Sequence, residues 1–219
     1  MRVANTLLAA LTLVVPVACD SDDDVATSLP VAQRFLTAED APGSNPDPVE
    51  TGRTAGDLDE FITEFEFVDP DEEEMTTVFE EAGFKGAGED TRFLGETHTP
   101  EAHHLISSYI ELGSEDGAKK ALDWLEADSM KPCPQSCAVQ ISTFDPGIAD
   151  ARGVHRLSTA QLIKNAGTPN QRPRDEYWIG FTEGSFVYTM VLFGPPGSSV
   201  SVEQAQEIAG TYHDRLSGN

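Results

Sequence analysis

Short stretches of the chain alternate hydrophobic and polar residues, and each is followed by residues with helical spacing. The stretches 61–67, 104–112 and 177–193 are rich in aromatic and β-branched residues, which is typical of strands in a half-buried sheet. Within 177–193, the turn sequence TEGS separates two apolar runs and predicts a β-hairpin. The chain therefore repeats an order of strand, turn and helix.

Capping residues mark the expected helix starts, and the apolar residues after each cap recur three and four positions apart. This spacing places them on one face, so we expect three to four amphipathic helices, the shortest within 158–167. The expected caps are Asp69 with Pro70 at the first helical position, Ser114, Ser158 and Ser201.

The strand pattern favours an α+β fold over a purely parallel sheet. A hairpin is explicit, and further short strands are expected at 91–95 and 138–144. We therefore predict a single α+β domain over 31–219, with an antiparallel or mixed sheet and helices packed on it. The segments 40–57 and 167–176 are rich in proline, glycine and polar residues, which predicts loops.

Residues 1–18 have the pattern of a secretory signal peptide. One basic residue, Arg2, precedes an apolar stretch over 7–17, which is shorter than the roughly 20 residues that a bilayer span needs. The sequence VAC that ends at Cys19 resembles a bacterial lipobox, in which the leader is cleaved before a cysteine that receives diacylglycerol. Pro16 departs from that pattern, because a lipobox usually carries Leu, Val or Ile three residues before the cysteine.

The lipobox resemblance implies a lipid anchor at Cys19 that holds the chain on the extracytoplasmic face of the cell membrane. The alternative is an ordinary signal peptide followed by an unmodified cysteine, which would give a secreted protein. Residues 19–30 contain several acids and few apolar residues, which predicts a short solvated tether.

Acidic residues greatly outnumber basic ones, and this limits the classes of partner. The chain has 38 Asp and Glu against 14 Lys and Arg, which gives a formal net charge of −24 at pH 7. Such a charge repels the phosphates of DNA and RNA, so nucleic acid is excluded as a partner. It also discourages close contact between the domain and anionic lipid head groups, whereas cationic partners and divalent ions remain compatible with it.

Cys133 and Cys137 have the spacing C-x3-C between prolines. In an oxidising compartment, two cysteines this close in sequence predict a local disulfide. The alternatives are a redox pair, which usually has C-x-x-C spacing, and half of a zinc site, which needs a second pair of Cys or His ligands.

The densest polar cluster is the sequence GETHTPEAHH, which holds three of the five histidines. His98, Glu101, His103 and His104 are candidate ligands for a transition metal, because such ions bind imidazoles and carboxylates. Pro100 interrupts any helix that would align them. Adjacent strand residues point to opposite faces, so at most one of His103 and His104 can join His98. The alternative is a polar connecting loop.

Positive and aromatic residues are the candidates for ligand recognition. The positive candidates are Arg152, His155, Arg156, Arg172 and Arg174. They offer bidentate contacts to an anionic ligand, unless they pair with local carboxylates such as Asp150 and Asp175. The aromatic candidates are Tyr177, Trp178 and Tyr188. They would form a recognition surface on an open sheet face, or else belong to the core.

No nucleophile motif is convincing. The sequence GFTEG has the outline of a nucleophile elbow, but Thr182 stands in place of serine and a strand follows where the elbow needs a helix. With 38 acids in the chain, paired carboxylates carry no information. We therefore expect no enzyme activity and no cofactor.

Two segments resemble known extracellular domains. FLTAEDAPG (35–43) is similar to an opening, LT-x-x-D-L-P-G, of actinobacterial envelope lipoproteins and of the extracellular sensor domains of their receptor kinases, with Ala41 in place of the leucine. The segment FTEGSFVYTMVLFGPPG (181–197), followed by an amphipathic helix, is also similar. The resemblance implies a secreted α+β sensor-like domain.

Together, these features predict a lipid-anchored extracytoplasmic binding or sensor-like protein of the bacterial envelope, without catalysis. Its partners are the membrane, through the anchor, and an envelope ligand or protein that the sequence does not identify. Two alternatives stay open: an envelope hydrolase, and a surface protein that binds a transition metal through the loop His98–His104.

Overall fold

The computed structural model describes residues 29–46, 52–65, 67–68, 70–95, 103–132, 139–158, 174–195 and 201–218. These residues form eight strands, four α-helices and a short 3-10 helix. The strands are β1 (Ser44–Pro46), β2 (Arg53–Ala55), β3 (Gly86–Leu94), β4 (His103–Glu111), β5 (Val139–Phe144), β6 (Arg152–Ser158), β7 (Arg174–Glu183) and β8 (Phe186–Gly194). The helices are η1 (Val31–Gln33), α2 (Leu58–Glu64), α3 (Glu72–Glu81), α4 (Glu115–Ser129) and α5 (Val202–Ser217).

The strands form one antiparallel sheet in the order β1-β3-β4-β8-β7-β6-β5, and β2 also pairs with β3. Strands β7 and β8 form a hairpin whose two connecting residues are Gly184 and Ser185. Gly184 has a φ of 54°, a left-handed conformation that glycine adopts without strain in tight hairpin turns. The predictions of an α+β fold, an antiparallel sheet and this hairpin are confirmed.

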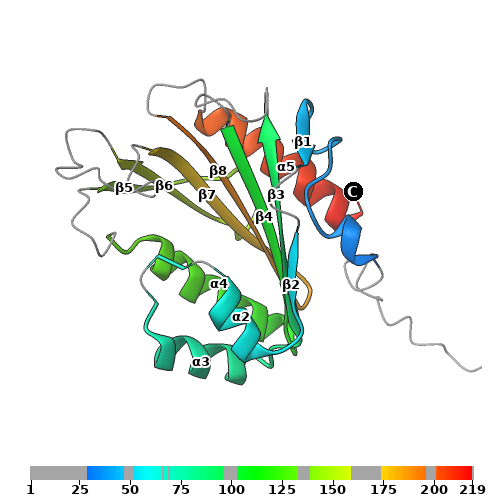
Figure 1. Cartoon of the computed structure of the whole chain (residues 1–219), viewed down its shortest axis with the longest axis vertical. Coiled ribbons are helices and arrows are strands. Elements are labelled where there is room, and N and C mark those ends of the chain that lie inside the picture. Colours follow the sequence, from blue (N-terminus) through cyan, green and yellow to red (C-terminus); the bar gives the residue numbers. More distant parts are fainter. Residues whose placement is uncertain are drawn as a thin grey trace, which may run out of the picture.

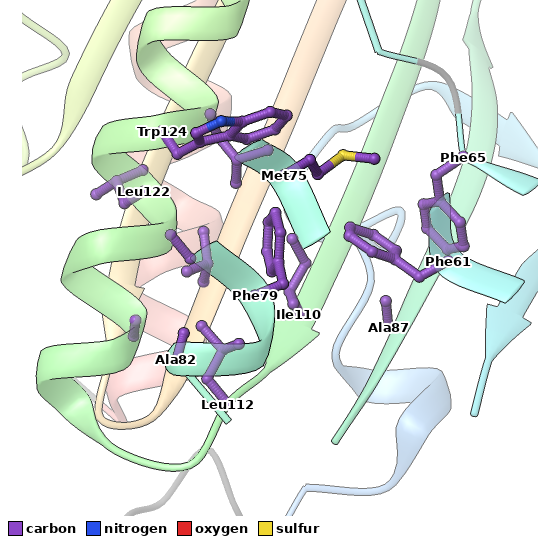
Figure 2. Close-up of a cluster of buried hydrophobic side chains, with 14 of the residues drawn as sticks. Phe61, Phe65, Met75, Phe79, Ala82, Ala87, Ile110, Leu112, Leu122 and Trp124 are labelled. Atoms are coloured by element: carbon purple, nitrogen blue, oxygen red, sulfur yellow. The ribbon is translucent and has the colours of Figure 1, made fainter. Parts of the chain in front are cut away.

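Helices α2, α3 and α4 lie together on one side of the sheet (Figure 1). Their apolar faces meet the sheet in a core rich in aromatic rings, in which Phe61 of α2 and Phe79 of α3 lie 5.1 Å apart, centroid to centroid. Figure 2 shows these rings and Trp124 of α4 gathered near Ala87 of β3 and Ile110 of β4. The hydroxyl of Ser114 accepts a hydrogen bond from the Gly117 amide at 3.1 Å, which confirms the predicted cap of α4.

Helix α5 covers the opposite side of the sheet (Figure 1). The hydroxyl of Ser201 accepts a hydrogen bond from the Gln204 amide at 3.2 Å, as the capping pattern predicts. The apolar residues that recur at helical spacing after this cap form a stripe of five, and all are buried against strands β4, β7 and β8: Ala205, Ile208, Ala209, Tyr212 and Leu216.

The first described segment is fixed along the α5 side of the sheet. Arg34 forms an ion pair with Glu111 at 3.0 Å, and the amide of Leu36 donates to the hydroxyl of Ser107 at 3.2 Å. Asp40, whose side chain is 1% exposed, is paired with Arg215 of α5 at 2.8 Å. The start of the described chain, which includes the FLTAEDAPG segment, is therefore bound both to strand β4 and to helix α5.

The structure corrects three local predictions. Residues 61–67 are not a strand, because the part up to Glu64 belongs to helix α2. The cap of α3 is Asp71, whose carboxylate accepts from the amides of Glu73 and Glu74, rather than Asp69. The two segments predicted as loops are not wholly irregular, since 40–57 contains β1 and β2 and 167–176 ends in the first three residues of β7. The predicted helix at 158–167 lies outside the described residues except for Ser158, which ends β6.

Candidate functional site

One half of the sheet face beneath α2–α4 is less covered than the other. Side chains four residues apart on a strand share a face, which makes the comparison direct. On β4, Ile110 is 3% exposed but Ile106 is half-buried, and on β8, Val187 is 0% exposed but Val191 is half-buried. If helices covered β4 and β8 along their whole length, all four of these side chains would be buried. We call the part of this face from Ile106 and Val191 to the ends of the strands the open half.

A row of aromatic rings crosses the open half. Phe93, His104 and Phe193 are register partners on β3, β4 and β8. The ring of His104 stacks on Phe193 with centroids 4.8 Å apart and an interplanar angle of 8°, and it meets Phe93 edge to face at 4.6 Å. The guanidinium of Arg174 lies over the Phe193 ring, with its central carbon 4.9 Å from the ring centroid. These side chains support one another, with Phe93 buried and His104, Phe193 and Arg174 half-buried.

Charged side chains continue the row toward β6. Glu176 on β7 is the register partner of both Phe193 and Arg156. Arg156 lies 3.7 Å from the Glu176 carboxylate and also donates to the backbone carbonyl of Lys131 at 3.5 Å. The open half therefore combines half-buried aliphatic side chains, an aromatic row and three charged groups.

His155, another of the predicted site residues, lies on the α5 side of the sheet and so faces away from Arg156. Its Nε2 is 2.7 Å from the Asp175 carboxylate, and its ring stacks on Tyr177 at 4.5 Å. Burial, together with Asp175 and Glu203, raises the pKa of Tyr177. This cluster is a second polar group of side chains, close to the start of α5.

Arg152 is engaged by helix α4. Its guanidinium lies 3.2 Å from Asp123 and 3.1 Å from Glu126, and it donates to the backbone carbonyl of Asp150 at 2.8 Å. Arg152 is therefore paired with carboxylates, which is one of the two interpretations that the sequence allows. The acids are Asp123 and Glu126 of α4 rather than the side chain of the neighbouring Asp150. Arg172 lies outside the described residues.

The three aromatic candidates do not form one surface. Tyr188 is 0% exposed, and Tyr177 and Trp178 are each 8% exposed. Trp178 belongs to the core under α4, whereas Tyr177 and Tyr188 belong to the core under α5. Because the residues lie on opposite faces of the sheet, a single ligand cannot contact all three.

The predicted metal ligands are only partly described. His98 and Glu101 lie outside the described residues, and His103 and His104 are neighbours on β4 that point to opposite faces. Burial lowers the pKa of His103, which favours its neutral form. Within the described ranges, no three His, Cys, Asp or Glu residues are arranged to hold a metal ion.

The cysteines of the predicted anchor and disulfide, Cys19, Cys133 and Cys137, also lie outside the described residues. Among the helices in the described part of the chain, none is both long enough and apolar enough to span a bilayer.

Glu176 of the open half was not identified from the sequence, and neither were four apolar residues: Phe93, Ile106, Val191 and Phe193. Each of these four belongs to a stretch that has the pattern of an ordinary strand. The signal that identifies them is cross-strand register together with the extent of helix cover, and neither is available before the strand order is known.

The comparisons with known proteins support the fold. No protein-family model and no curated protein matches the chain. Among solved structures, the chain is similar to the crystal structure of the extracellular domain of PknH from Mycobacterium tuberculosis, with a TM-score of 0.50 and 10% identity. The match covers 87% of this chain and 93% of that chain. The fold therefore resembles an extracellular domain, in agreement with the sequence resemblance.

Proposed function

We propose that this chain is a lipid-anchored, extracytoplasmic binding or sensor-like protein of the bacterial envelope that binds its ligand on the open half and does not catalyse a reaction. The observation that carries the proposal is the loss of burial along the two central strands. Ile106 and Val191 are half-buried, although Ile110 and Val187 on the same strands are buried under the helices. Ligand sites commonly combine such apolar side chains with a few polar groups.

A binding role fits the side-chain chemistry better than hydrolysis does. The histidine best placed to act as a base is His155, since Asp175 orients it at 2.7 Å. Its register partner is the exposed Ser142, but in the described part of the chain no hydrogen bond joins the serine to the imidazole. A serine nucleophile needs that bond to lose its proton.

The test is a titration of the isotope-labelled full chain with fractions of a small-molecule and lipid extract from bacterial envelopes. The methyl resonances of Ile106 and Val191 report on the open half, and those of Ile179 and Ile208 report on the α5 side. We expect at least one fraction to shift the first pair and leave the second pair unchanged.

Matched variants make the test specific. Ile106→Glu should abolish the response, because it places a charge in the apolar part of the open half. Ser142→Glu places the same charge on the other face of the sheet, at an exposed position, and should leave the response unchanged. Shifts that survive Ile106→Glu, or that occur on the α5 side, would reject the proposed location.

A further inference from the structure

Arg174 differs from every other arginine in the described part of the chain. The other six each have a carboxylate within 4.0 Å: Arg34 with Glu111, Arg53 with Glu89, Arg92 with Asp90, Arg152 with Asp123 and Glu126, Arg156 with Glu176, and Arg215 with Asp40. Within those same described ranges, Arg174 has no carboxylate at that distance. The chain has 38 acids, so an arginine without a carboxylate partner among the described residues stands out.

The packing of Arg174 orients its donors. The central carbon of the guanidinium lies over the Phe193 ring, 4.9 Å from its centroid, so the group is held against an aromatic surface. The N–H groups of a guanidinium form a rigid planar fork, and those that do not face the ring are available for a bidentate contact. Its backbone is fixed by β6, because the amide of Arg174 donates to the hydroxyl of Ser158 at 2.8 Å.

The side chains around Arg174 indicate that its ligand has an apolar part as well as an anionic group. Apart from the paired Arg156 and Glu176, the half-buried side chains that extend from Arg174 across the open half are apolar or aromatic, namely Phe193, His104, Val191 and Ile106. The nearest acid in the row, Glu176, is paired with Arg156 at 3.7 Å, so its charge is largely offset. The region therefore offers one positive group at the margin of an apolar surface.

We infer that the open half binds a small amphiphile whose oxyanion head group, a carboxylate or a phosphate, is held by Arg174 while its apolar body lies over Ile106 and Val191. This inference rests on the proposed function and deepens it by naming the ligand class. A whole anionic membrane surface fits less well, because the chain carries a large negative charge and the described residues include a single arginine of this kind. A single head group matches a single guanidinium.

The experiment titrates the full chain with octanoate and octyl phosphate, and separately with acetate, inorganic phosphate and octanol. The side-chain Nε–Hε resonance of Arg174 and the methyl resonances of Ile106 and Val191 are followed by NMR. We expect octanoate or octyl phosphate to bind at least tenfold more tightly than each of the three partial probes, and to shift all of these resonances. Whichever of octanoate and octyl phosphate binds more tightly identifies the head group as a carboxylate or a phosphate.

Two variants test the role of the arginine. Arg174→Gln should weaken binding of the preferred probe at least tenfold, because a charge-assisted hydrogen bond contributes more than a neutral one. Arg152→Gln removes an arginine already paired with Asp123 and Glu126, and should leave the affinity unchanged.

Equal affinity for octanol and both anionic amphiphiles would overturn the inference, and this comparison needs no variant. Unchanged affinity in Arg174→Gln would also overturn it. If an envelope fraction shifts Ile106 and Val191 equally in the native chain and in Arg174→Gln, the proposed function stands and the amphiphile inference fails. If no fraction and no probe shifts them, both fail.

Discussion

Arg215 is a single side chain that holds the first described segment to the last helix. Its guanidinium binds both carboxylate oxygens of Asp40 at 2.8 Å and donates to the backbone carbonyls of Gln33 and Phe35 at 2.5 and 2.8 Å. The amide and hydroxyl of Thr37 complete the shell of Asp40, at 2.7 and 2.9 Å. The LT-x-x-D part of the FLTAEDAPG segment thus has a physical role, since Thr37 donates two hydrogen bonds to the Asp40 carboxylate that Arg215 binds.

We expect Arg215→Ala to lower the free energy of unfolding by about 3–5 kcal/mol, because it leaves the buried Asp40 carboxylate without its counter-charge. The measurement is equilibrium unfolding in urea. Lys119→Ala is the control, because Lys119 and Glu115 form an exposed pair on α4 whose loss should leave the free energy of unfolding nearly unchanged. Equal losses in the two variants would show that the Arg215 network contributes nothing beyond a surface ion pair.

At the scale of single elements, two glycines within helices have opposite roles. An added Cβ at Gly117 in the first turn of α4 would lie 2.5 Å from the carbonyl oxygen of Ala82, at the end of α3. At Gly210 in α5, an added Cβ meets no atom within 4 Å. Gly117 therefore permits the close approach of α4 to α3, whereas Gly210 only adds freedom to the unfolded chain.

The substitution Gly117→Ala should destabilise the protein by about 1–3 kcal/mol, since a backbone atom must move to relieve the contact. The same change at Gly210 should stabilise it by about 0.5–1 kcal/mol, because alanine has the higher helix propensity. Thermal unfolding of the two variants checks both signs. A stable Gly117→Ala variant would contradict the close packing of α3 against α4.

The elements that the sequence predicted correctly are those with two independent signals. Helix α5 has a capping hydroxyl at Ser201 and a five-residue apolar stripe, and both are found in the structure. The segment 61–67 carried an ambiguous signal, because phenylalanines at 61 and 65 satisfy the spacing of a helix as well as that of a strand. The Asp57 carboxylate, which accepts from the Glu60 amide at 2.9 Å, selects the helix.

At the scale of the whole molecule, the candidate surface could be predicted only in part. Arg156 and Arg174 were identified as rare positive residues, yet one is paired with Glu176 and the other is stacked on Phe193. Their difference arises from strand order, because β8 brings Phe193 beside β7. The two faces of the sheet also separate His155 from Arg156, and such a separation follows only from the alternation of side chains on β6.

The strand order also relates the open half to the expected anchor. Arg34 contacts Glu111 at the last residue of β4, whereas His104 lies at the start of that strand. A nine-residue strand spans about 30 Å, so the first described segment starts near one end of β4 and the open half lies near the other. The ten Cα-to-Cα steps from Cys19 to Leu29 span at most about 35 Å.

Lipidation of Cys19 would therefore attach the membrane anchor through a segment that enters the described structure near the end of β4 opposite the open half. We expect Cys19→Ser to move the protein from the membrane fraction to the soluble extracytoplasmic fraction, because the net charge of −24 opposes contact between the domain and anionic lipid. Fractionation with mass analysis of the N-terminal peptide measures this, and Cys133→Ser is the matched control that should stay membrane-bound. An unmodified Cys19 in mature native protein, or a Cys19→Ser variant that remains in the membrane fraction, would reject the anchor while leaving the binding surface to its own test.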